Sequence, residues 1–127
     1  MQGKHLYEYA VIRLVPKVER EEFFNVGIIL FSKRAKYIKA LYKVDENKLN
    51  LFSSELDRES LFANLHVFDK ICSGTKEGGP IAALDVPERF RWLTAVRSAS
   101  IQTSRPHPGF SDELDQTLEI LFRELVL

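Results

Sequence analysis

The sequence of 127 residues contains one cysteine, Cys72, so no disulfide can form within the chain. A lone cysteine fits the reducing cytosol better than an extracellular compartment. The N-terminal residues lack the apolar core of a signal peptide. The longest apolar runs, such as 26–31, are far shorter than the ~18 residues that a membrane span needs. We therefore expect a cytoplasmic protein that does not enter a membrane.

The motifs of several enzyme and cofactor classes are also missing. The chain has neither a Gly-x-x-x-x-Gly-Lys loop nor a Gly-x-Gly-x-x-Gly turn for nucleotide phosphates. It has no Cys-x-x-Cys or His-x-x-x-His spacing, and His5, His66 and His107 are far apart in sequence, so a zinc site is not predicted. No pair of carboxylates suited to a hydrolytic metal stands out. We expect no metal and no cofactor.

What the sequence does contain is typical of one globular domain. Hydrophobic residues make up 45% and charged residues 28% of the chain, which is ordinary for a folded protein. A chain of this length buries roughly two thirds of the surface that its unfolded form exposes. No repeat, low-complexity tract or linker divides it, so residues 1–127 are predicted to form a single domain.

Charge is balanced overall but uneven along the chain. Residues 1–43 hold nine Lys/Arg against four Asp/Glu (net +5), and residues 44–88 hold four against nine (net −5). Residues 89–110 hold four arginines and no acid (net +4), whereas residues 111–127 hold one base and five acids (net −4). If the two basic segments share a face, that face could attract an anion or a phosphate backbone. Alternatively, they lie on different faces and are solvated separately.

The N-terminal part of the chain predicts three strands. Residues 6–15 are rich in β-branched and aromatic types and stop at a proline, 26–31 contain an interior glycine, and 37–42 carry lysine at a predicted edge. Gly27 indicates a bulge or a close backbone approach. The intervening residues 17–24 are predicted to form a helical turn or loop.

The remainder predicts helices and one further strand. Asp45 is expected to cap a short helix to about residue 52, and a capping box at 54–57 to begin a longer one. That longer helix has an apolar stripe and ends at a glycine; its stripe comprises Leu61, Leu65, Phe68 and Cys72. We expect Cys72 to be a core residue.

Three further elements follow in the C-terminal third. Asp85 and Pro87 are predicted to begin a short helix. Residues 99–104 are predicted to form a fourth strand. The proline-rich stretch 105–109 is predicted to be irregular. Ser111 is expected to cap a last, leucine-rich helix. The order of elements predicts an α+β fold with a mainly antiparallel sheet of about four strands packed against helices.

The stretch 90–109 is the strongest candidate for a functional site. It is rich in guanidinium, hydroxyl and amide groups and has no carboxylate, and such groups hold phosphates or carboxylates. Together with Arg13, the candidate anion-binding residues are Arg91, Arg97, Gln102, Ser104 and His107, with His107 as acid, base or hydrogen-bond donor. In the alternative interpretation, Trp92 and Ile101 are core, the arginines pair with acidic helices, and His107 braces a turn.

Arg13 is also a candidate for a structural ion pair. It stands on a largely apolar predicted strand, and an unpaired buried charge is very costly. Glu22 is the predicted partner, in a cluster with Arg20 and Asn25. A structural Arg13–Glu22 pair that fixes the 16–25 connection is favoured over a catalytic role.

Two blocks of the sequence resemble a bacterial family known as domain of unknown function 3037. The first runs through Tyr9-Ala10-Val11-Ile12-Arg13-Leu14-Val15-Pro16 and Arg20-Glu21-Glu22-Phe23-Phe24-Asn25-Val26-Gly27-Ile28-Ile29-Leu30-Phe31. The second comprises 90–98, 101–104 and 107–109, and the final helix matches as well. The resemblance implies no activity and no catalytic residues. It implies as a partner a kinase-like protein of the HipA type, encoded nearby.

Two hypotheses of function follow. The first is a non-enzymatic accessory or binding protein, a partner of such a HipA-like kinase. The alternative is a nucleotide- or nucleic-acid-acting enzyme that uses an Arg/His anion-binding pocket around Arg91, Arg97 and His107. Plain nucleic-acid binding is less favoured because the net charge of the chain is zero.

Overall fold

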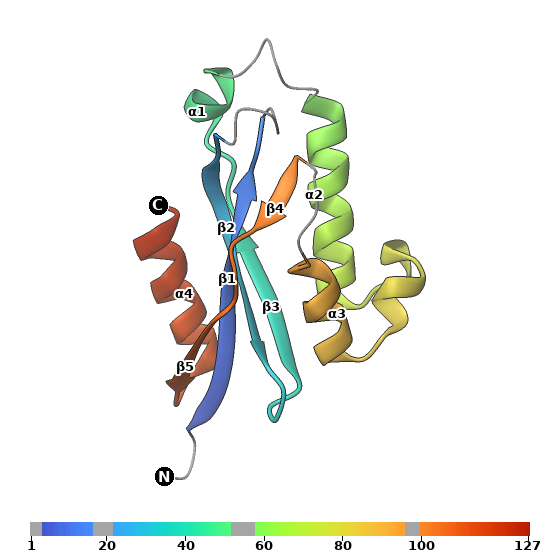
Figure 1. The fold of residues 1–127 in the computed structure, drawn as a ribbon, viewed down its shortest axis with the longest axis vertical. Helices are drawn as coiled ribbons and strands as arrows, with labels where there is room; N and C mark the ends of the chain where they lie inside the picture. Colours follow the sequence, from blue (N-terminus) through green and yellow to red (C-terminus); the bar gives the residue numbers. More distant parts are fainter. Residues whose placement is uncertain (1–3, 17–21, 52–57, 96–99) are drawn as a thin grey trace.

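The computed structural model describes residues 4–16, 22–51, 58–95 and 100–127. Within them, five strands form one open antiparallel sheet (Figure 1). The strands are β1 (His5–Leu14), β2 (Phe24–Ser32), β3 (Tyr37–Tyr42), β4 (Ile101–Thr103) and β5 (His107–Ser111). The order is β3-β2-β1-β4, with β5 also pairing with β1. β4 pairs with the C-terminal end of β1, and β5 pairs with the N-terminal end of β1. The two short strands therefore lie one after the other along the same side of β1.

Helices cover both faces of the sheet, as Figure 1 shows. They are α1 (Glu46–Asn50), α2 (Arg58–Ser73), α3 (Val86–Leu93) and α4 (Leu114–Leu125), with 3₁₀ turns η2 (Lys76–Gly78) and η3 (Pro80–Ala83) between α2 and α3. Helices α2 and α3 lie on one face and α4 lies on the other. The predicted α+β class is confirmed. No helix of the described segments is long and apolar enough to cross a membrane.

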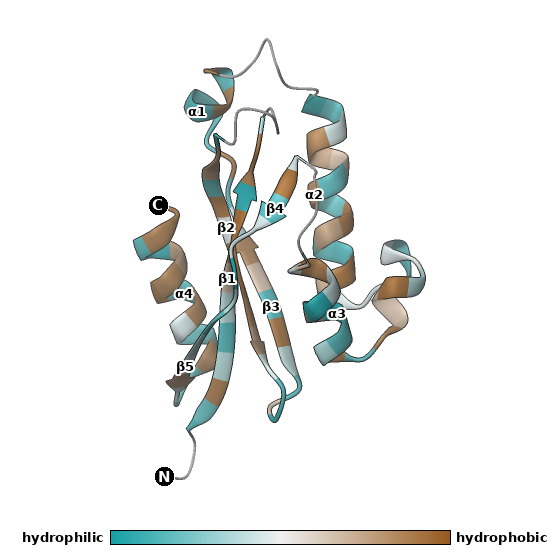
Figure 2. Ribbon diagram, viewed as in Figure 1, coloured by the Kyte–Doolittle hydropathy of each residue, from teal (hydrophilic) through white to brown (hydrophobic). Residues whose placement is uncertain are grey.

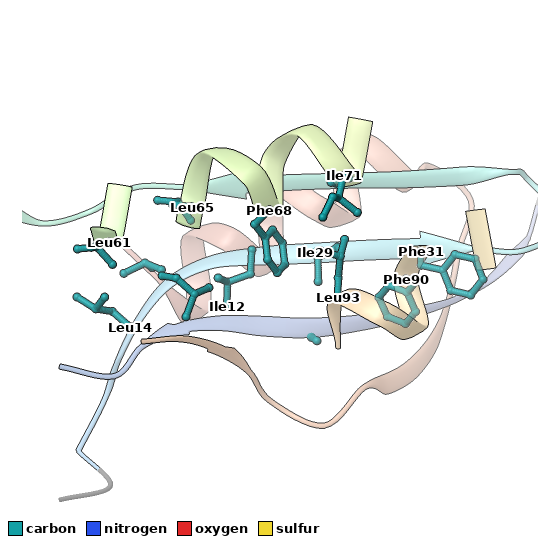
Figure 3. Packing of buried hydrophobic residues seen from close by; sticks show 14 of the residues in the cluster. Ile12, Leu14, Ile29, Phe31, Leu61, Leu65, Phe68, Ile71, Phe90 and Leu93 are labelled. Carbon is teal, nitrogen blue, oxygen red and sulfur yellow. The ribbon is translucent and has the colours of Figure 1, made fainter. Parts of the chain in front are cut away.

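The alternation of β1 divides the core into two layers. Ala10, Ile12 and Leu14 are buried against α2 and α3, together with the α2 stripe that the sequence predicted. Figure 3 shows Ile12 and Leu14 of β1 lying close to Leu61 and Leu65 of α2 within this layer. Val11 is buried on the other face against Leu114 and Leu118 of α4. Hydrophobic residues accordingly follow the inner surfaces of both helical layers and the central strands (Figure 2).

Gly27 allows the sheet to bend where β1, β2 and β3 meet. The register of β1 and β2 shifts between Ile12 and Arg13, which is a bulge. A Cβ on residue 27 would lie 2.5 Å from the carbonyl oxygen of Leu41 and 2.8 Å from Cβ of Tyr42. Both features predicted for this glycine are therefore present. The bulge lies directly beside Arg13 and so affects the candidate site.

Most predicted elements are confirmed, including the capped helix starts. Asp45 Oδ1 accepts hydrogen bonds from the backbone N–H groups of Asn47 and Lys48, and Asp85 Oδ1 accepts one from Glu88. Helix α2 ends at Ser73, and Gly74 follows with a φ of 74°. The predicted capping box at 54–57 lies outside the described residues.

Three predictions about local structure were wrong. The stretch 105–109 is not wholly irregular, because β5 begins at His107; an edge strand tolerates proline where the ring nitrogen faces away from its neighbour. Phe24 belongs to β2 rather than to the predicted helical turn or loop; Glu22 and Phe23 are in a loop as predicted, and 17–21 lie outside the described residues. Ser111 ends β5 and does not cap α4, which begins at Leu114. Its Oγ accepts a hydrogen bond from the backbone N–H of Glu113 at 3.0 Å.

Candidate functional site

Four of the six predicted anion-binding residues lie along one line of the sheet. Arg13 on β1 is directly opposite Gln102 on β4, and Tyr9 on β1 is opposite His107 on β5. Ser104 lies between them, beside Val11. Residues directly opposite each other in antiparallel strands point to the same face. The alternation of β1 puts all of these side chains on the face that α4 covers.

We call Tyr9, Arg13, Gln102 and His107 the polar strip. Helix α4 packs mainly over β2 and β3, so the strip lies toward the other side of the sheet. His107 is exposed, and the other three side chains are partly exposed. Among the described residues, the strip is therefore open to solvent at His107 and half-buried at its other three side chains.

Arg13 is held against an aromatic ring. Its Cζ lies 4.2 Å from the centroid of the Phe23 ring, a cation–π contact. Its Nε is buried and has no hydrogen-bond partner in the described structure. The guanidinium is planar, so stacking on the ring occupies one of its faces and leaves its in-plane N–H groups able to bind a carboxylate or phosphate with two hydrogen bonds.

Neighbouring Asn25 ties this end of the sheet to the last helix. Asn25 is directly opposite Arg13 on β2, and its Nδ2 donates to the backbone carbonyl of Leu125 at 2.9 Å. The C-terminal end of α4 is thus fixed beside Arg13. Because helix C-termini carry partial negative charge, this placement favours a cation nearby.

Ser104 has a structural role between the two short strands. Its Oγ accepts a hydrogen bond from the backbone N–H of Val11 at 2.8 Å and donates one to the carbonyl of Arg105 at 3.0 Å. Its own backbone N–H donates to the Val11 carbonyl at 2.8 Å. Ser104 thus satisfies both backbone groups of Val11 where the chain passes from β4 to β5. With its hydroxyl buried and used in this way, it does not extend the polar strip.

His107 belongs to an aromatic row at the β5 end of the strip. The His107 and Tyr9 rings are 5.3 Å apart at an interplanar angle of 35°, and the Tyr9 and Tyr7 rings are 6.4 Å apart. Burial, with a smaller effect of Tyr9, raises the pKa of Tyr7 above its ordinary value. Tyr7 therefore stays a neutral phenol at neutral pH. Flat rings of this kind present π-faces on which another ring can stack.

Arg91 lies on a different surface from the polar strip. It is exposed on α3, which covers the opposite face of the sheet, and it lines a groove with Lys33 and Phe31. The sheet therefore separates Arg91 from His107, and the two do not form one pocket. Arg97, the remaining candidate, and Arg20 lie outside the described residues.

The Arg13–Glu22 ion pair stays a prediction. Glu22 is exposed and lies two residues before β2. The contact described for Arg13 is with the ring of the next residue, Phe23. The sequence did not indicate Phe23 as a site residue. The separation of Phe23 and Arg13 along the chain does not show that the two side chains are in contact. In the sequence, Tyr7, Tyr9 and Arg13 stand at alternate positions of the first predicted strand. This spacing could have indicated that they share one face of the sheet.

The described residues contain no group of three His, Cys, Asp or Glu side chains that could hold a metal ion. The polar strip itself presents a guanidinium, an amide, a phenol and an imidazole. These groups recognise anions and flat ligands by hydrogen bonding and stacking.

Residues 9–126 match the family described as Protein of unknown function (DUF3037). The chain belongs to this family. No curated protein and no solved structure matches the chain. The match includes both blocks in which the resemblance was noted, and it includes the whole polar strip.

Proposed function

We propose that this member of the DUF3037 family is a non-enzymatic binding protein, and that its polar strip holds an anionic group of its partner. The placement of Arg13 carries the proposal. Its guanidinium is stacked on Phe23, its Nε is an unpaired buried donor, and Gln102 lies directly opposite. A buried donor without a partner raises the free energy of the unbound state. An anion close to the guanidinium offsets part of that cost.

The partner that the family resemblance suggests is a kinase-like protein of the HipA type. Such a partner would present an acidic or a phosphorylated side chain, and both groups accept hydrogen bonds from arginine in the same geometry. The partly exposed strip suits a group carried on another protein better than a small substrate that must be enclosed for chemistry. Ser104 is used in the sheet, so it supplies no nucleophile to this face.

A nucleotide is the second candidate ligand, and the Tyr9–His107 pair favours it. A base could stack on these rings while the phosphate binds Arg13, as in proteins that hold single-stranded nucleic acid on aromatic side chains. This alternative corresponds to the nucleotide-acting enzyme considered from the sequence, without Arg91. If this alternative is correct, the protein binds a nucleotide more tightly than it binds phosphate alone.

Amide NMR titrations of the purified domain with inorganic phosphate and with AMP test these ideas. We expect resonance changes in residues 9–13 and 101–107, and a roughly tenfold weaker Kd in Arg13→Gln, corresponding to the loss of one charge-assisted hydrogen bond. His107→Ala should also weaken binding. Arg91→Ala is the matched control, because it removes a guanidinium from the opposite face.

Three outcomes separate the candidates. Phosphate binding that AMP does not improve supports the anion site of a binding protein, and clearly tighter AMP binding supports the nucleotide alternative. Changes that centre on α3, or that Arg91→Ala abolishes, contradict the polar strip as the site. Co-purification with a kinase-like protein encoded nearby tests that partner specifically. The proposal is supported if the wild-type chain co-purifies with it and the Arg13→Gln variant does not.

A further inference from the structure

A groove of about 670 Å³ lies on the face of the sheet opposite the polar strip. Its apolar lining includes Phe31 of β2 and Phe90 of α3, whose rings are stacked with centroids 4.7 Å apart. Figure 3 shows these two rings side by side at the end of the buried cluster. Leu6 of β1 also lines the groove and is 55% exposed. An apolar lining of this size fits an aromatic side chain.

Charged groups of both signs line the same groove. Lys33 and Arg91 supply positive charge, and Glu8 and Asp85 supply negative charge. The Asp85 carboxylate already caps α3 through the backbone N–H of Glu88. The two bases therefore offer ion pairing to a ligand that carries acids beside an aromatic group.

The chain carries such a segment itself, next to the groove. Phe110 of β5 is 67% exposed and is directly opposite Leu6, so both side chains point to the same face of the sheet. It does not line the groove of its own chain. Two exposed acids, Asp112 and Glu113, follow it in sequence. Phe110 and Leu6 thus form an exposed apolar pair beside the groove, and contiguous exposed apolar surface, unlike single scattered residues, marks an interaction site.

We infer that the groove receives Phe110 of a second copy of this chain, in a symmetric dimer. Each copy then supplies one aromatic side chain and one groove, which is the arrangement that a two-fold axis produces. Asp112 and Glu113 of one copy face Lys33 and Arg91 of the other. Phe110 is directly opposite Leu6, which lines the groove, so each copy presents its aromatic side chain next to its own groove.

The edge strand itself favours contact through side chains over strand pairing. Pro108 lacks the backbone N–H that a neighbouring strand would need, and Pro106 interrupts the strand just before β5 begins. A continuous sheet across two copies is therefore disfavoured along this edge. Side chains such as Phe110 remain the available means of association.

Sedimentation velocity of the full chain over a range of concentrations tests the inference. A small interface of two aromatic anchors predicts a weak dimer, with a Kd on the order of 10–100 µM. Phe110→Ser should weaken it at least ~10-fold, as expected for a central anchor. Phe62→Ser is the control, because Phe62 is also an exposed phenylalanine, at 39%, but lies on α2 and does not line the groove.

A charge swap tests the geometry independently of stability. The doubly substituted chains Lys33→Glu/Arg91→Glu and Asp112→Lys/Glu113→Lys should each fail to self-associate, because groove and segment then carry like charge. Mixed together, they should form a heterodimer in which both contacts are attractive. Circular dichroism and thermal melting establish that each variant is folded.

The possible results of these experiments either support or overturn the dimer. A wild-type dimer that Phe110→Ser disrupts and Phe62→Ser does not, with pairing of the two charge variants, supports the inference. A wild-type chain that stays monomeric throughout overturns it, and so does a dimer that Phe110→Ser leaves unchanged. Neither result depends on whether the polar strip binds an anion.

Discussion

Tyr7 lies over the backbone of Gly109, so residue 109 has no room for a side chain. A Cβ at this position would lie 2.5 Å from Cζ and 3.0 Å from Cε2 of Tyr7. The two residues are directly opposite each other in β1 and β5. An aromatic ring that covers a glycine in the neighbouring strand protects the backbone there and helps to set the register.

Gly109→Ala is therefore expected to destabilise the protein by about 1–3 kcal/mol, the usual cost of overpacking. Urea denaturation followed by circular dichroism measures the change in the free energy of unfolding. The same substitution in a Tyr7→Ala background should cost much less, because the clash is with the ring. An equal cost in both backgrounds would show that the glycine is required for another reason.

Cys72 is a core thiol and not a reactive one. It is 3% exposed on the inner stripe of α2, and burial raises its pKa to about 12. The thiolate is the nucleophilic form, so the folded protein should react very slowly with a thiol reagent at pH 8. Tyr37 and Tyr42 also have raised pKa values, chiefly through burial.

These shifts fix the sign of the pH dependence in alkali. The unfolded thiol ionises near its ordinary pKa of 9.0 while the folded thiol stays protonated, so the unfolded state gains stability as pH rises. We expect the free energy of unfolding to fall between pH 9 and about pH 12. Cys72→Ser should reduce that slope. Rapid labelling of Cys72 at pH 8 without denaturant, or stability that rises above pH 9, would contradict this account.

At the scale of elements, Arg89 connects two helices. Its Nη1 donates to the carbonyl oxygens of Ile71 at 3.1 Å and Cys72 at 3.0 Å, in the last turn of α2. A Cβ on Gly74 would lie 2.6 Å from that nitrogen. The guanidinium therefore satisfies two terminal carbonyls and complements the negative end of the helix.

Arg89→Ala should lower the free energy of unfolding by about 1.5–3 kcal/mol, because two carbonyls lose a charged donor. Arg91→Ala, two residues along the same helix and exposed, should change it by no more than about 0.5 kcal/mol. Thermal and chemical denaturation of the two variants compare them directly. Equal effects would mean that the contact with α2 contributes little.

The same residues show how far the elements could be predicted. Periodicity identified α2 and its buried stripe, because that signal depends only on neighbours three and four positions apart. It failed at 105–109, where prolines usually exclude a strand but an edge position tolerates them. Arg89 was recognised only as part of a basic segment. Its role depends on the carbonyls of α2, which ends at Ser73, sixteen residues earlier.

For the molecule as a whole, the sequence predicted the fold class and several site residues, but not how those residues are arranged in space. The α+β class followed from the order of elements, and the sequence indicated Arg13, Gln102 and His107 from their chemistry. It could not show that these residues form one strip and that Arg91 lies across the sheet, since that depends on the register of β1 with β4 and β5. Register between segments some ninety residues apart is set by packing, which local patterns do not record.

The position of β1 has a consequence for synthesis of the protein. The ribosome makes β1 before the other strands of this sheet, yet β4 and β5, which pair with one side of it, come after helices α1, α2 and α3. Until residue 111 has emerged, one edge of an apolar strand stays unpaired, and such edges invite aggregation. The sheet can therefore be completed only after residue 111 has been made, and we expect newly made chains to depend on chaperones until then.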